Sequence, residues 1–212
     1  MTELTAVFLG AAAGFAMGDW VARVRHDVRL EYLCKPATVV MLVAVALSLM
    51  PGHDAGARRW WFVVALVLSL AGDVLLMLPA DDFVAGLAAF LVGHLCYVAG
   101  FWTDGPGAVP LVVALVVVAV AVAPLGARIL GALGGQAALR LAVALYMVVI
   151  SVMLATALAV GNPFAAVGAA LFVGSDAMIA WNRFVKPFRG ADVGIMVTYH
   201  LGQAGLVLSL LH

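Results

Sequence analysis

Residues 112–123 read VVALVVVAVAVA, twelve consecutive positions without a polar side chain. A run of this kind suits the hydrocarbon core of a bilayer, which a helix of about 20 predominantly apolar residues can cross. The whole chain has the same character, because 66% of its 212 residues are hydrophobic, 10% are charged, and the mean hydropathy is +1.17. Soluble domains carry about 25% charged residues. The sequence therefore excludes a soluble globular protein and predicts an integral membrane protein.

Eight segments have the length and apolar character of spanning helices, and short links rich in proline, glycine or charge separate them. We expect an all-α fold, a polytopic helix bundle that forms a single transmembrane domain over 1–212. Because the links leave no room for an extramembrane domain, the function has to lie within the bundle. The expected segments are 4–22, 33–50, 60–78, 83–102, 108–126, 139–160, 164–183 and 192–211.

The basic residues are segregated between the two sides of this bundle. Nine of the eleven Lys and Arg residues fall on one side, and only Arg58 and Arg59 fall on the other. By the positive-inside rule, the side with nine faces the cytoplasm and both termini lie outside it. The excess of arginine over lysine, with abundant Ala, Gly and Val, indicates a GC-rich bacterial genome. A multi-pass protein of the bacterial inner membrane is expected.

Several other features limit the function classes. A net charge of zero provides no basic surface for nucleic acid. Cys34 and Cys96 lie in apolar segments, where buried free thiols are expected. The spacing of Gly10, Gly14 and Gly18 predicts close helix packing. The segment 108–126 is expected to be a lipid-facing scaffold without chemistry of its own.

Two aspartates are the most informative polar residues. Asp73 and Asp176 each lie about thirteen residues into a segment that runs from the outer to the cytoplasmic side, so their carboxyl groups are expected at similar depth. An Asp near the centre of a spanning helix costs about 2.5–3.5 kcal/mol on insertion scales. Each of the two therefore requires a partner, a polar cavity or a function.

Further polar side chains fall in the same cytoplasmic half of the expected helices, whereas the outer half carries few. Such clustering predicts a pocket that opens toward the cytoplasmic leaflet. His94 either has a direct chemical role or is a packing element. Lys35, followed by Pro36, opens the segment 33–50. Its ammonium group either pairs with a carboxylate, pairs with a lipid phosphate or anchors the helix at the interface. Candidates that contact or support a substrate are Lys35, His94, Tyr97, Tyr146, Ser175, Tyr199 and Gln203.

The chemistry of two carboxyl groups in a low-dielectric site is restrictive. They cannot both remain ionised at low cost, so one is expected to keep its proton while the other stays anionic. An acid and a base of this kind suit hydrolysis through an oxocarbenium-like state. A Ser-His-Asp signature, a Walker loop and an HExxH motif are absent from the sequence. Adjacent helical residues do not face each other, which disfavours Ser175 as a nucleophile activated by Asp176.

The order of these motifs resembles the YhhN-like lysoplasmalogenase family. The resemblance rests on Lys35-Pro36, Gly72-Asp73 with Leu75-Leu76-Met77, Phe90 with Gly93-His94 and Tyr97, Tyr146, Leu171-Phe172 with Ser175-Asp176, and Tyr199 with Gln203. It implies an integral membrane hydrolase that cleaves the vinyl ether bond of lysoplasmalogens to a fatty aldehyde and a glycerophospho-base. It further implies Asp73 and Asp176 as the catalytic pair, no metal or organic cofactor, and an amphiphilic lysolipid as substrate. His200 stands where relatives often carry a second tyrosine.

Two alternatives remain open at this stage. In the first, His94 and His200 bind zinc together with one or both aspartates, in a metal-dependent membrane lipid hydrolase. In the second, the polar cluster is a binding site of a small-solute membrane transporter.

Overall fold

The computed structural model describes residues 2–49, 56–78, 82–103 and 105–211. Within these ranges it contains eight α-helices that are long and apolar enough to cross a membrane, and no strand. The predicted all-α class and the predicted number of spanning segments are confirmed. The helices are α1 (Glu3–Arg25), α2 (Val28–Ser48), α3 (Gly56–Met77), α4 (Phe83–Trp102), α5 (Ala108–Ala132), α6 (Ala137–Ala159), α7 (Pro163–Ala180), continued by the π-helix η1 (Trp181–Val185), and α8 (Ala191–Leu208), continued by the 3₁₀-helix η2 (Ser209–Leu211).

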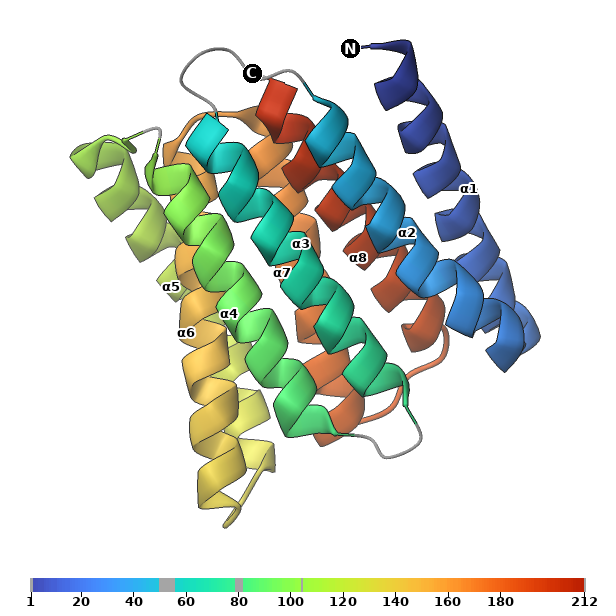
Figure 1. The fold of residues 1–212 in the computed structure, drawn as a ribbon. Coiled ribbons are helices and arrows are strands. Elements are labelled where there is room, and N and C mark those ends of the chain that lie inside the picture. Colours follow the sequence, from blue (N-terminus) through green and yellow to red (C-terminus); the bar gives the residue numbers. More distant parts are fainter. Residues whose placement is uncertain (1, 50–55, 79–81, 104, 212) are drawn as a thin grey trace.

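Consecutive helices pack as hairpins, α1 with α2, α3 with α4, α5 with α6, and α7 with α8. The N- and C-termini lie at the same end of the bundle (Figure 1). Additional contacts join α4 to α6, α2 to α3, and α8 to both α1 and α2. The helices α2, α3, α4, α7 and α8 therefore surround the middle of the bundle, while α1 and α5 lie at its two edges (Figure 1).

Helix α2 begins five residues before the predicted segment 33–50. Asp27 is its N-cap, because its carboxylate accepts hydrogen bonds from the backbone amides of Arg29 and Leu30, each at 3.1 Å. Pro36 consequently lies inside the helix, and the expectation that Lys35-Pro36 opens it was wrong. The extra turns carry Lys35 away from the end of the helix and into the bundle, where it is buried.

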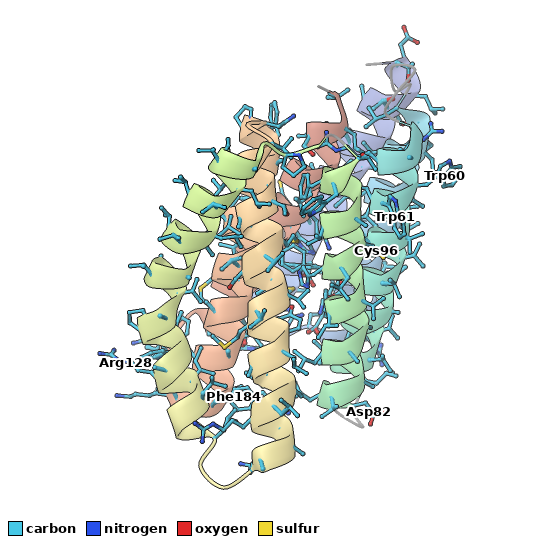
Figure 2. All side chains as sticks on the ribbon, turned by 90° about the vertical axis from the view of Figure 1, so that its left-hand side faces the viewer. Trp60, Trp61, Asp82, Cys96, Arg128 and Phe184 are labelled. Carbon is cyan, nitrogen blue, oxygen red and sulfur yellow. The ribbon has the colours of Figure 1, made fainter. Side chains whose placement is uncertain are left out.

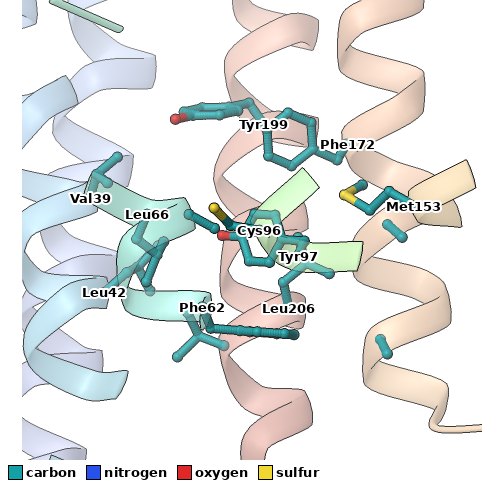
Figure 3. Close-up of a cluster of buried hydrophobic side chains, with 14 of the residues drawn as sticks. Val39, Leu42, Phe62, Leu66, Cys96, Tyr97, Met153, Phe172, Tyr199 and Leu206 are labelled. Carbon is teal, nitrogen blue, oxygen red and sulfur yellow. The ribbon is translucent and has the colours of Figure 1, made fainter. Parts of the chain in front are cut away.

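A layer of buried hydrophobic side chains, several of them aromatic, lies in the interior of the bundle (Figure 3). The ring of Phe62 packs edge-on against Tyr97 and Phe101, with centroids 4.9 and 5.2 Å apart. Leu66 of α3 and Leu206 of α8 are fully buried beside them.

Glycines allow α7 and α8 to pack closely, whereas the sequence predicted close packing at the glycines of α1. A Cβ atom on Gly168 of α7 would lie 2.6 Å from the Leu206 nitrogen and 2.9 Å from the Gly202 oxygen of α8. On α1, by contrast, Gly10 and Gly14 have no neighbouring atom within 4 Å of the Cβ position, and only Gly18 contacts another helix, at Cys34. The prediction of packing along all three α1 glycines was wrong for Gly10 and Gly14.

The surface suits a bilayer. Helix α5 exposes a face of valines, with Val109 and Val120 exposed to 75% and 69%, which agrees with its predicted lipid-facing position. Trp60 and Trp61 lie near one end of the bundle and Asp82 near the other (Figure 2). Aromatic side chains of this kind are typical of the membrane interface.

Candidate functional site

Asp73 is the centre of a buried network of polar side chains. Its Oδ1 atom lies 3.0 Å from the Lys35 ammonium nitrogen, and its Oδ2 atom accepts a hydrogen bond from the Tyr199 hydroxyl at 2.5 Å. All three residues are buried. Of the three interpretations of Lys35 left open by the sequence, the structure supports the partner of a carboxylate, and an anchor at the interface is wrong.

The same network of side chains continues through α8 to α4. The Gln203 amide nitrogen donates to the Tyr199 hydroxyl oxygen at 3.3 Å, and the Tyr97 hydroxyl donates to the Gln203 carbonyl oxygen at 2.6 Å. Tyr199 and Gln203 are one helical turn apart on α8, so both reach the same face. Lys35, Asp73, Tyr97, Tyr199 and Gln203, all predicted site residues, are thus joined in one network that spans α2, α3, α4 and α8.

Asp176 has a different environment. Its carboxylate accepts a hydrogen bond from the Tyr146 hydroxyl of α6, and among the described residues it makes no ion pair. It also lines an otherwise apolar pocket between α4, α5, α6 and α7. The carboxyl groups of Asp73 and Asp176 are near enough for their charges to interact.

Aromatic side chains fill the space between the two carboxyl groups. The ring of His94 lies 4.7 Å from Phe172 and 5.3 Å from Tyr146, centroid to centroid. The ring centroid of Tyr199 lies 5.3 Å from that of Phe172. His94 is buried, and neither of its ring nitrogens has a hydrogen-bond partner among the described residues. A buried imidazole of this kind can bind a water molecule or a polar atom of a substrate.

Ser175 belongs to the helix packing. Its hydroxyl is buried and donates to the backbone carbonyl of Ile195 on α8 at 3.0 Å, so it ties α7 to α8 beside Asp176. The second histidine of the metal alternative, His200, packs against α1. His200 accepts a hydrogen bond at Nδ1 from the Trp20 indole at 3.1 Å. In the part of the chain that the structure describes, no three His, Cys, Asp or Glu residues lie close enough to hold a metal ion.

A second fully buried aspartate, besides Asp73, escaped the sequence analysis. Asp19 of α1 is completely buried, and its closest cation is Arg23, 3.8 Å away and one helical turn on. Arg23 in turn lies 2.9 Å from Glu31 of α2. The Asp19 charge is also near enough to interact with Lys35 and Asp73. The dipeptide Gly18-Asp19 matches Gly72-Asp73 and was a usable signal, but the three arginines after it made this segment look like a membrane boundary.

The half of the bundle near the termini contains more polar structure than expected. Arg58 is buried there, donates to the Ser209 hydroxyl at 3.0 Å, and lies over the rings of Phe62 and Phe101. Asn162 donates to the Ser209 carbonyl at 3.2 Å. This group ties α3 and α7 to the C-terminal end of α8.

Comparison with known proteins identifies relatives of this architecture. The lysoplasmalogenase of Mycobacterium tuberculosis is 39% identical over 177 residues, which are 80% of this chain and 66% of that protein. The human lysoplasmalogenase TMEM86B is 38% identical over 149 residues, 69% of this chain and 62% of that protein. The mouse protein is 34% identical over 178 residues, 84% of this chain and 73% of that protein.

The chain spans just under two thirds of the length of the mycobacterial relative. No solved structure matches significantly. The model of the YhhN family matches residues 30–210, a range that contains both aspartates and all the supporting residues predicted from the sequence. By this match over most of its length, the chain belongs to the YhhN family.

Proposed function

We propose that the protein hydrolyses the vinyl ether bond of lysoplasmalogen-type lysophospholipids, releasing a fatty aldehyde and a glycerophospho-base. The names of its relatives support the reaction. The observation that carries the proposal is the contrast between two carboxyl groups: Asp73 is buried and paired with Lys35, whereas Asp176 is half-buried and faces a largely apolar pocket. A vinyl ether needs a proton donor beside an apolar chain and an anion to stabilise the cation that forms.

The environments assign the two roles. A lysine ammonium at 3.0 Å and a tyrosine hydroxyl donor both favour the carboxylate form of Asp73 and oppose the effect of its burial. Asp176 has no such cation among the described residues, and the neutral acid is the cheaper form of a carboxyl group against hydrocarbon. Asp176 is therefore the acid that contacts the substrate, and Asp73 is the anion that stabilises positive charge.

The reaction then runs in three steps. Asp176 transfers its proton to the vinyl carbon distal to the ether oxygen, which leaves an oxocarbenium ion and the Asp176 carboxylate. Water adds to the carbon bonded to oxygen, and its proton returns to Asp176, giving a hemiacetal. The carbon–oxygen bond to glycerol then breaks as the hemiacetal hydroxyl loses a proton and the glycerol oxygen gains one. One water is consumed and no proton is gained or lost overall.

Neighbouring side chains support these steps. Tyr146 orients Asp176 through its hydrogen bond, and His94, with two unpartnered ring nitrogens, positions the attacking water. Tyr199, Gln203 and Tyr97 fix the orientation of Asp73 through their hydrogen-bond chain. Lys35 neutralises Asp73 and contributes positive charge for the substrate phosphate. An amphiphilic substrate of this kind enters from the cytoplasmic leaflet of the bacterial inner membrane, with both protein termini outside the cytoplasm.

The test is aldehyde release from a lysoplasmenyl lipid by purified protein in detergent. We expect activity from the wild type and losses in Asp73→Asn and Asp176→Asn, compared at matched melting temperature. Asp192→Asn, at an exposed position at the start of α8, is the matched control and should retain activity. Full activity in both site variants would contradict the proposed mechanism, and a folded wild type that releases no aldehyde would contradict the proposed function.

A further inference from the structure

The pocket beside Asp176 is built almost entirely from hydrocarbon. It has an empty volume of about 810 Å³, which includes open space at its mouth. The polar side chains among its described lining residues are Asp176, Tyr146 and Ser151. The apolar lining includes Leu87, Phe90, Ile129, Val143, Ile150 and Val173. A water-soluble substrate would require more polar groups on such walls to replace its hydration.

A second hollow runs along the outside of α5 and α6. It is a groove of about 910 Å³ with an apolar lining, and Val122 of α5 with Met147 and Ser151 of α6 line both the groove and the pocket. The two hollows therefore adjoin between these helices. Val148, which lines the groove on α6, is 60% exposed, so the groove opens on the outer surface of the bundle.

The distance from the carboxyl group to this junction is short. Ser151 lies five residues beyond Tyr146 on α6, a rise of about 7.5 Å along the helix axis. A chain that begins beside Asp176 and Tyr146 thus reaches the junction after a few carbon atoms. From there a longer chain continues in the groove.

We propose that this pocket and groove form a lateral channel for the hydrocarbon chain of a single-chain lipid. The reacting bond lies beside Asp176, and the end of the chain passes between α5 and α6 into the bilayer. The inference rests on the proposed function for its substrate class. It adds the path of the chain, the helix pair that opens to the membrane, and Val122, Met147 and Ser151 as the residues that determine chain-length specificity.

The channel also explains a preference for one chain over two. The pocket and the groove meet at three shared lining residues, so the proposed passage between them is narrow and admits a single chain. A lipid with two chains would have to bring its second chain through the same junction or bury it against the aromatic group of Phe90, His94 and Phe172. Interior packing of that group is already tight, with ring centroids 4.7–6.4 Å apart.

The kinetic test blocks the junction. In Val122→Trp, kcat/KM for a lysolipid with a hexadecenyl chain should fall about tenfold relative to kcat/KM for a butenyl analogue, whose chain ends before the junction. Val120→Trp, on the same helix but facing lipid, should leave the ratio unchanged. An equal fall for both chains, or an unchanged ratio in Val122→Trp, would overturn the channel.

A binding test separates this inference from the proposed reaction. The probe is a lysophospholipid with a saturated ether-linked hexadecyl chain that carries a diazirine at mid-chain, so it cannot be hydrolysed as a vinyl ether. Irradiation of the wild type should label the α6 peptide that contains Met147, unlabelled lysolipid should compete, and diacyl phospholipid should not. Labelling confined to other helices would overturn the channel. Labelling at Met147 without aldehyde release by the wild type would instead uphold the channel and refute the reaction.

Discussion

The ammonium nitrogen of Lys35 lies 3.0 Å from the carboxylate of Asp73, in the interior of a membrane-spanning bundle. Asp176, at similar depth, is hydrogen-bonded to Tyr146 and faces hydrocarbon. The same side chain thus occurs in two environments that favour opposite charge states. Acid and base roles are commonly divided in this way between two carboxyl groups in one site.

The Lys35–Asp73 pair predicts a strong loss when one partner is removed alone. Lys35→Met leaves Asp73 without its cation, so the protein should be less stable by about 3 kcal/mol. Aldehyde release should fall about 100-fold, because the anion that stabilises the oxocarbenium is then neutralised by a proton. Both effects can be measured by thermal unfolding in detergent and by the aldehyde assay.

The double variant Lys35→Met/Asp73→Asn is the control for that prediction. It removes both charges, so much of the lost stability should return, while activity stays low. If the double variant were as unstable as Lys35→Met alone, the pair would not act as a buried ion pair.

Loss of the Tyr146 hydroxyl should impair the chemical step. Tyr146→Phe removes the hydrogen bond that orients Asp176 and that stabilises the carboxylate left when Asp176 gives up its proton. The rate constant kcat should therefore decrease about tenfold or more, since hydrogen bonds to charged groups contribute about 1.5–3 kcal/mol. Tyr32→Phe is the matched control, because the Tyr32 hydroxyl donates to the Met77 carbonyl at an exposed position. Equal kinetics for the two variants would argue against a role of Tyr146 in catalysis.

The proposed proton transfer predicts where a solvent proton ends up. In D₂O the fatty aldehyde should carry one deuterium on the carbon next to the carbonyl, because Asp176 exchanges with solvent and then protonates that carbon. Mass spectrometry of the aldehyde, trapped at once to prevent exchange, measures this. The absence of deuterium at that carbon would exclude protonation of the vinyl group as the first step.

Much of the fold could be predicted because its physical cause is local. Twenty apolar residues in succession define a spanning helix whatever its neighbours, and the predicted segment 83–102 coincides with α4. The common depth of Asp73 and Asp176 also followed from counting residues along their helices. The start of α2 was missed because the apolar run begins later than the helix, although Asp27 is a recognisable N-cap.

The partners within the site could not be predicted, since they depend on how helices are rotated and shifted against each other. Nothing local to Asp73 specifies Lys35 and Tyr199, which come from two other helices. The same holds for Asp19, whose burial results from the packing of α1 on α2 and α8. At Gly10 and Gly14 of α1 the sequence predicted a close contact that the structure does not show. A small residue permits a close contact without requiring one.

The contact between α7 and α8 should tolerate no side chain at Gly168. In Gly168→Val, Cβ would lie 2.6 Å from the Leu206 nitrogen and 2.9 Å from the Gly202 oxygen, and these backbone atoms can move only if the helices separate. The melting temperature should fall, with a cost of about 1–3 kcal/mol or more from overpacking. Activity should fall with it, because α7 carries Asp176 and α8 carries Tyr199. Gly10→Val, at a position with no atom within 4 Å, is the control and should melt near the wild type. A Gly168→Val protein with wild-type stability would mean that the two helices are not in close contact at this point.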